Sequence, residues 1–173
     1  MTVLLRPASP GRSNALVAIV AAIVTAAGMA LAIPVPVLTV SDGTTEFVGT
    51  LDAAEAIQYS YRQSIYQVTV FEELSRAGDS IGINRVRSID VRSVEYFGWK
   101  GEPAQASDGL WVEDAPASVA DSAELVIRVT PAGEQRFATA GWSVALRPRF
   151  GETVVRVRAE SRPWLVALLQ GAR

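Results

Sequence analysis

Two adjacent carboxylates, Glu72 and Glu73, come nearest in type and spacing to a catalytic pair. Acid-base cleavage of a glycosidic bond needs two carboxyl groups that face each other across about 5 to 10 Å. Both residues fall in an extended run, where neighbouring side chains point to opposite faces, so they cannot act together. We expect strand-end charges instead, paired with Arg62, Arg85 or Arg87 of a neighbouring strand.

The absence of histidine and cysteine removes most other catalytic chemistry. Serine–histidine and cysteine–histidine catalysis, disulfides and the usual zinc, copper and iron–sulfur sites all need one of these residue types. A serine–lysine pair would depend on Lys100, the one lysine beside fifteen arginines. The sequence therefore predicts a protein that is not an enzyme, without catalytic residues, metal site or cofactor.

The clearest strand signal, residues 57–74, changes its apolar face partway along. Apolar residues stand first at odd and then at even positions: Ile57, Tyr59 and Tyr61, followed by Tyr66, Val68 and Val70. Side chains alternate along a strand, so one regular strand cannot keep both sets in the same core. A bulge, bend or turn must interrupt the chain within residues 62–65.

Polar side chains at this interruption are candidates for binding, because backbone groups there lack regular ladder partners. We expect at least one of them to face a concave, partly exposed surface. Aromatic side chains around Tyr61 and Trp99 would line a shallow ligand pocket, although an ordinary core is the commoner explanation for such residues. The candidate ligand- or partner-binding residues are Tyr61, Arg62, Gln63, Ser64, Glu72 and Trp99.

Beyond Val35 the chain consists of short extended runs separated by turn residues, which predicts an all-β fold. The expected architecture is an antiparallel β-sandwich or a small barrel. Hairpins are expected around turns at 41–44 and 77–80, the second returning as strands over 81–96, and between 142–146 and 155–159, with an arginine-bearing wet face. Residues 98–124 are expected to be irregular, and residues 164–169 to pack on the domain as a last strand or helical turn.

The N-terminal segment predicts one membrane anchor. Arg6 and Arg12 precede twenty-six uncharged residues, 15–40, and about 20 apolar residues span a bilayer. The basic start puts the N-terminus in the cytoplasm and the remainder outside. The competing interpretation is a cleaved signal peptide with the motif Ala30-Leu31-Ala32, which gives a secreted protein.

The domain boundary follows from this segment. We expect a cytoplasmic stub and a transmembrane or signal segment in residues 1–34, with residues 15–32 in the membrane. Residues 35–173 then form an extracytoplasmic β domain.

Charge is unevenly distributed along the chain. Residues 42–124 carry fifteen acids and six bases, and residues 125–173 carry three acids and eight bases. The two halves are expected to interleave in one fold with solvated charged faces. The alternative is a basic surface that meets lipid headgroups or an acidic partner, built from Arg147, Arg149, Arg156, Arg158 and Arg162. The acidic pI of about 5.2 and the lack of a binding motif argue against nucleic acid.

The candidate residues also have a familiar order. Tyr-Arg-Gln-Ser-Ile at 61–65 is followed by Glu72 and, after a hairpin, by Val-Glu-Tyr-Phe-Gly-Trp at 94–99. Over residues 37–165 this order resembles the small exported prokaryotic family known as domain of unknown function 1850. That family has an aromatic, a variable residue, His-Ser-Val, a later acid, and an aromatic-glycine segment that ends near proline, here Pro103.

In this comparison Gln63 stands where the family has histidine, while Ser64, Ile65 and Glu72 match. An amide cannot bind metal or transfer protons as histidine does, so at most a hydrogen-bonding version of such a site remains. Members of that family are typically encoded beside the membrane subunits of tripartite, TRAP-type solute transporters.

The resemblance therefore implies an extracytoplasmic accessory role. We expect a membrane-tethered interaction module that contacts a transporter membrane subunit. The alternative is a secreted small-ligand-binding β domain, with Arg62, Gln63 and Ser64 at the polar end of its pocket.

Overall fold

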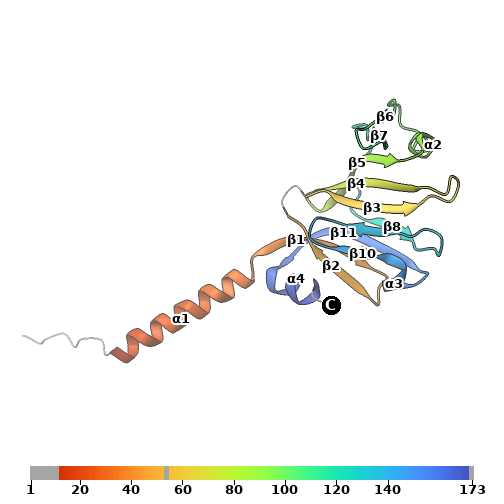
Figure 1. Cartoon of the computed structure of the whole chain (residues 1–173). Coiled ribbons are helices and arrows are strands. Elements are labelled where there is room, and N and C mark those ends of the chain that lie inside the picture. Colours follow the sequence, from red (N-terminus) through yellow and green to blue (C-terminus); the bar gives the residue numbers. More distant parts are fainter. Residues whose placement is uncertain (1–11, 53–54, 172–173) are drawn as a thin grey trace, which may run out of the picture.

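The protein folds into two antiparallel β-sheets with short helices (Figure 1). The computed structural model describes residues 12–52 and 55–171. The helices are α1 (Arg12–Leu31), α2 (Val91–Glu95), α3 (Leu146–Phe150) and α4 (Trp164–Gly171). The strands are β1 (Pro34–Ser41), β2 (Glu46–Thr50), β3 (Ile57–Arg62), β4 (Thr69–Ala77), β5 (Ser80–Ser88), β6 (Ala104–Gln105), β7 (Trp111–Asp114), β8 (Leu125–Arg128), β9 (Arg136–Ala138), β10 (Ser143–Ala145) and β11 (Val154–Pro163).

The two sheets are open and lie together as a sandwich. The smaller sheet has the strand order β2-β1-β11-β8, and the larger has the order β10-β9-β3-β4-β5-β7-β6. Pairing of β1 with β11, for example Val37 with Glu160, brings the beginning and the end of the domain together. The prediction of a mostly β, antiparallel fold is confirmed, in a sandwich-like form.

Alternating apolar residues fill the space between the sheets. On β11, Val155 and Val157 are buried while Arg156 and Arg158 are exposed, so the predicted arginine-bearing face of this strand is confirmed. The largest fully buried side chains come from both sheets and the α3 region: Phe137, Leu38, Ile57, Leu74, Ile81 and Leu146.

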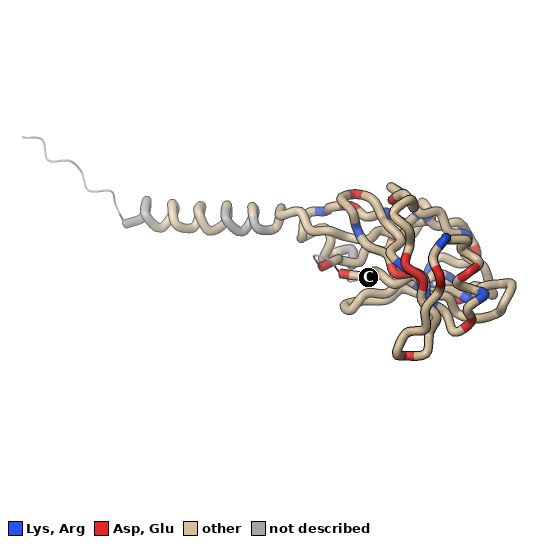
Figure 2. Tube along the Cα trace, turned by 90° about the horizontal axis from the view of Figure 1, so that it is seen from above, with Lys and Arg blue, Asp and Glu red and all other residues tan. Residues whose placement is uncertain are grey.

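Helix α1 projects away from the sheets as an isolated rod (Figures 1 and 2). The chain carries no charge from Leu16 to the end of this helix at Leu31. In the part of the chain that the structure describes, no helix has both the length and the hydropathy of a membrane span. Strand β1 begins at Pro34, shortly after the helix ends.

The first predicted hairpin is present as β1 and β2. The Asp42 carboxylate accepts hydrogen bonds from the amides of Thr44 (2.8 Å) and Thr45 (2.7 Å). Gly43 has a φ of 91°, which a residue without Cβ adopts at no steric cost. These contacts hold the predicted turn at 41–44.

The prediction of strands over residues 81–96 is correct only as far as Ser88. Strand β5 ends there, and the next residues form helix α2. The Asp90 side chain accepts a hydrogen bond from the Arg92 amide at 3.0 Å and caps this helix. Val94 is buried on the helix, so the apolar residues expected on a strand here lie on a helix instead.

The prediction that residues 142–146 and 155–159 pair as a C-terminal hairpin is also wrong. Strand β10 pairs with β9 in the larger sheet, whereas β11 pairs with β1 and β8 in the smaller one. Helix α3 lies between them and buries Leu146 and Phe150. Two segments that are neighbours in sequence therefore belong to different sheets.

The last described segment packs on the domain as helix α4, one of the two predicted forms. Its Ala167 is buried in a small cluster with Val37 and Val48. The Trp164 amide donates a hydrogen bond to the Ile33 carbonyl oxygen at 2.9 Å. Helix α4 therefore lies beside the chain segment that joins α1 to β1.

Candidate functional site

The predicted interruption at residues 62–65 is a turn between β3 and β4. The Gln63 amide donates to the Val68 carbonyl at 2.9 Å, and the Gln67 amide donates to the Gln63 carbonyl at 2.9 Å. Gln67 has a φ of 58°, an uncommon conformation for a residue with a side chain. The first apolar set lies on β3, whereas Tyr66 and Val68 lie in the turn and Val70 lies on β4. The change of face therefore reflects the end of one strand and the start of another.

The turn separates two of the candidate polar residues. Gln63 is buried, and among the described residues its Oε1 has no hydrogen-bond partner. Ser64 is exposed, and its carbonyl oxygen accepts a hydrogen bond from Gln67 Nε2 at 2.5 Å. These neighbours do not form one polar surface.

The two carboxylates lie on opposite faces, as predicted. Glu73 pairs with Arg85 (3.6 Å) and Arg87 (3.4 Å) on β5, so the expected charge pairing is confirmed for this residue. For Glu72 the expected arginine pairing is wrong. Its side chain lies on the inner face, where it hydrogen-bonds with the Tyr61 hydroxyl.

The surroundings of Glu72 disfavour its charged form. Burial raises the pKa of its carboxyl, and the hydrogen bond with Tyr61 partly opposes that rise. Burial also raises the pKa of the Tyr61 hydroxyl, and the Glu72 charge adds to this shift. Tyr61 and Glu72 are thus brought together as predicted candidates, and the Glu72 carboxyl lies in the sheet interior.

Trp99 lies in the same region as Tyr61. Both pack against a buried cluster formed by Val70, Val86 and Val94. The ring of Trp99 also contacts Phe97, with 5.2 Å between ring centroids. These aromatic residues serve as core around α2, which was the alternative explanation for them.

A groove does open on the outer face of the larger sheet, and Tyr61 and Arg62 lie on it. Its volume is about 450 Å³. We call it the arginine groove and define it by Ser60, Arg62, Thr69, Glu134, Arg136 and Arg147. It runs between the end of β3, the loop before β9, and α3.

Three different elements supply the arginines of this groove. Arg62 comes from β3, Arg136 from β9 and Arg147 from α3. The excess of arginine after residue 125 indicated Arg147 as part of a basic surface. Nothing in the sequence placed Arg136 and Arg147 beside Arg62, because that depends on the pairing of β3 with β9.

Three other arginines of the predicted basic surface, Arg156, Arg158 and Arg162, pair with acids. Glu124 pairs with both Arg156 and Arg158. Arg162 hydrogen-bonds Glu46 (2.7 Å) and Glu160 (2.7 Å). Acids of both chain halves thus neutralise this face, as the interleaved arrangement requires.

Among the described residues, no three or more histidine, cysteine or acidic side chains lie together in a way that could hold a metal ion. No family model matches the chain, and no curated protein or solved structure matches it. The resemblance to domain of unknown function 1850 stays a prediction.

Proposed function

We propose that this protein is a membrane-tethered, extracytoplasmic β domain that works as an accessory or interaction module. Its anchor is the uncharged segment of residues 15–32, which follows Arg6 and Arg12. The basic start holds the N-terminus in the cytoplasm. The β domain then lies outside.

The observation that carries the proposal is the exposure of apolar side chains along α1. Each of these side chains is more than half exposed: Leu16, Val17, Ile19, Val20, Ile23, Val24 and Met29. Contiguous exposed apolar surface marks sites of protein or membrane contact. A bilayer supplies the apolar surroundings that the domain does not give this helix.

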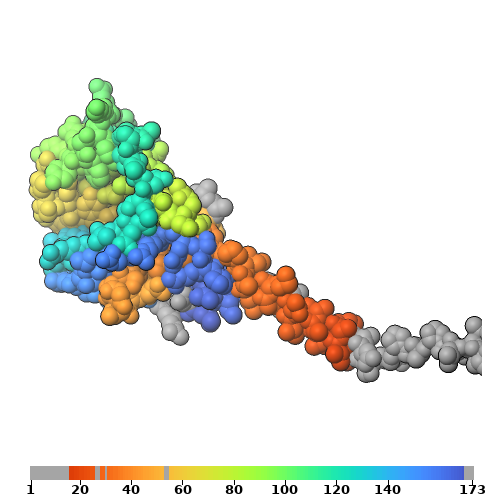
Figure 3. All heavy atoms as spheres, turned by 180° about the vertical axis from the view of Figure 1, so that it is seen from behind, coloured from red at the N-terminus to blue at the C-terminus, as the bar shows by residue number. Residues whose placement is uncertain are grey.

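Helix α4 supports the same arrangement. It has no charged residue, and five of its apolar side chains are exposed: Trp164, Leu165, Val166, Leu168 and Leu169. Figure 3 shows its atoms beside the base of α1. Tryptophan is enriched where a membrane meets water, so we infer that α4 rests on the surface from which α1 emerges.

The partner that fits the resemblance is a membrane subunit of a TRAP-type solute transporter. Such a partner would contact the β domain close to the bilayer. This assignment depends on the order of residues around Gln63 and Glu72.

The full chain, produced in a bacterial host, tests the anchor through membrane fractionation and an alkaline wash. We expect it to stay in the membrane and its domain to be cut by protease added outside. The double variant Ile19→Arg/Ile23→Arg should leave the membrane, because each central arginine costs about 2.5 to 3.5 kcal/mol on insertion. The matched control Val126→Arg, at an exposed valine of β8, should be retained.

Two results would overturn the proposal in different ways. Release of the parent chain into the medium with Ile33 at its N-terminus would establish the alternative, a secreted ligand-binding domain. Retention without any membrane protein captured by cross-linking would remove the interaction role and leave the anchor.

A further inference from the structure

We propose that the arginine groove binds a small organic anion through a carboxylate or phosphate group. This site lies in the β domain itself and does not depend on how the chain is tethered. Failure of the anchor proposal would therefore leave this one standing, and the reverse also holds.

Strand register places the polar groups of the groove on one face. Arg62 is paired with Thr69 on β4, and Ser60 is paired with Arg136 on β9. Residues that are directly opposite each other in a sheet share a face. Two guanidinium groups and two hydroxyl groups thus point to the outer side of the larger sheet, and α3 adds Arg147 at the margin.

The charge of the groove is positive. It contains three guanidinium groups and one carboxylate, Glu134. Arg62 meets Glu134 at 3.6 Å, with side chains that are 44% and 66% exposed. Such exposed ion pairs contribute little free energy, so an incoming anion can replace this contact.

The other two arginines keep donors available. Among the described residues, Arg136 has no carboxylate within 4.0 Å, and its Nη1 lies 3.5 Å from Ser143 Oγ. Arg147 pairs with Glu152 at 3.2 Å, and both of these side chains are about half exposed. A guanidinium group offers paired donors that match the two oxygens of a carboxylate or phosphate. The groove therefore fits an oxyanion better than a neutral ligand.

The wall of the groove is held in place by internal hydrogen bonds. Gln135 is buried, and its Nε2 donates to the Arg128 carbonyl at 2.9 Å. The Arg62 amide donates to the Gly133 carbonyl at 2.7 Å, which fixes the loop to β3. Glu134 adopts a φ of 49°, an uncommon conformation that the surroundings must maintain. A site held this way loses little entropy when a ligand binds.

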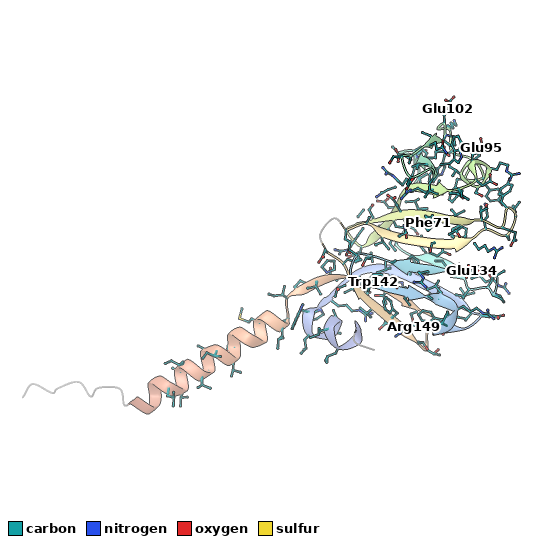
Figure 4. All side chains as sticks on the ribbon, in the orientation of Figure 1. Phe71, Glu95, Glu102, Glu134, Trp142 and Arg149 are labelled. Carbon is teal, nitrogen blue, oxygen red and sulfur yellow. The ribbon has the colours of Figure 1, made fainter. Side chains whose placement is uncertain are left out.

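The position of the groove favours a dissolved anion over a lipid headgroup. Glu134 lies on the side of the domain away from α1 (Figure 4). A helix that enters the membrane would keep this side of the domain toward the aqueous compartment.

The test is an NMR titration of the full chain in detergent micelles, with inorganic phosphate in one arm and acetate in the other. Chloride at equal ionic strength serves as the reference. We expect saturable shifts at the arginine side chains of the groove, with a Kd on the order of 1 mM for these small probes. The arm that binds more tightly identifies the group, phosphoryl or carboxyl, that the natural ligand carries.

Variants locate the binding. Arg136→Gln and Arg147→Gln should each weaken it about tenfold or more, and Arg136→Lys should weaken it less, because the charge remains without the paired donors. Arg92→Gln removes an exposed arginine of α2 outside the groove and should change nothing. The three side chains replaced in these four variants are exposed, so melting temperatures should stay within a few degrees and show that the variants fold. Equal binding in every variant, or no saturable shift with either ion, would overturn the proposal.

Discussion

Trp142 Nε1 donates a hydrogen bond to the Thr50 carbonyl oxygen at 2.6 Å and joins the two sheets at their edges. Trp142 immediately precedes β10, the edge strand of the larger sheet, and Thr50 ends β2, the edge strand of the smaller one. The indole ring also meets Phe47 edge-to-face, with 5.2 Å between centroids. Figure 4 labels this tryptophan at the junction. Trp142 therefore links the edge strands of the two sheets at one open side of the sandwich.

Trp142→Phe should lower the free energy of unfolding by about 1 kcal/mol, because it keeps an aromatic ring and removes the hydrogen bond. Denaturant unfolding measures this change. Trp164→Phe is the control, since no described residue hydrogen-bonds the side chain of this tryptophan in α4. Equal effects of the two substitutions would mean that the bond to Thr50 does not stabilise the domain.

Gly49→Ala should be destabilising by about 1 to 3 kcal/mol, because the new methyl group would overlap the Trp142 ring. Gly141→Ala is the matched control, since a Cβ there meets nothing within 4 Å. The same unfolding experiment compares them. A Gly49→Ala protein as stable as the control would show that the indole can move aside freely.

Glu72→Gln should stabilise the protein at neutral pH. Burial raises the folded-state pKa of Glu72 above its ordinary value of 4.5, so the unfolded state releases this proton first as pH rises. Stability is therefore lost as pH increases through the window between the two pKa values, and the loss is complete above it. Melting temperatures of parent and variant should agree near pH 4 and separate by pH 7.

The control for this prediction is Glu73→Gln on the opposite face. It removes the carboxylate that pairs with Arg85 and Arg87 and should give no gain at pH 7. A stabilising effect of Glu73→Gln equal to that of Glu72→Gln would contradict burial as the cause.

Gln63→Met should raise the free energy of unfolding by about 1 kcal/mol. The substitution keeps the length of the side chain and removes a buried oxygen that lacks a partner among the described residues. Gln58→Met on the outer face of β3 provides the comparison and should be close to neutral. Lower stability of Gln63→Met would show that Oε1 is satisfied in solution, for example by water.

Arg162→Gln should cost about 1 kcal/mol at neutral pH, since the arginine holds Glu46 with two hydrogen bonds of 2.9 and 2.7 Å. This contact lowers the pKa of Glu46. A carboxyl whose folded pKa is lowered stabilises above its unfolded value of 4.5 and loses that contribution as pH falls through the folded pKa. The difference from the parent should accordingly shrink in acid, and a difference independent of pH would contradict the role of this pair.

Sequence patterns predicted those elements that depend on local chemistry. Gly43 and the carboxylate of Asp42 act within their own turn, so the hairpin of β1 and β2 was predictable. The interruption after Arg62 was predictable too, because a change of face cannot occur in one regular strand. Its form, a turn with Gln67 at positive φ, was not.

The predictions were wrong where a local pattern fits both a strand and a helix. They were also wrong where strands that are distant in sequence pair with each other. Strands were predicted over residues 81–96, yet the Asp90 cap directs the chain into α2 after β5. Strands β10 and β11 are close in sequence, but Val157 pairs with Val40 of β1. The arginine groove was missed for the same reason, since its residues meet only after the larger sheet has formed.

The position of β1 has a mechanical consequence. This strand continues from α1, and it lies inside the smaller sheet between β2 and β11. A pulling force on α1 therefore enters the domain at an interior strand, which cannot peel away until the ladders on both of its sides break. The ladder with β11 alone extends from Pro34 to Ser41, and its hydrogen bonds share a load directed along the strand. The domain is thus joined to α1 through an interior strand, which resists tension better than an edge strand would.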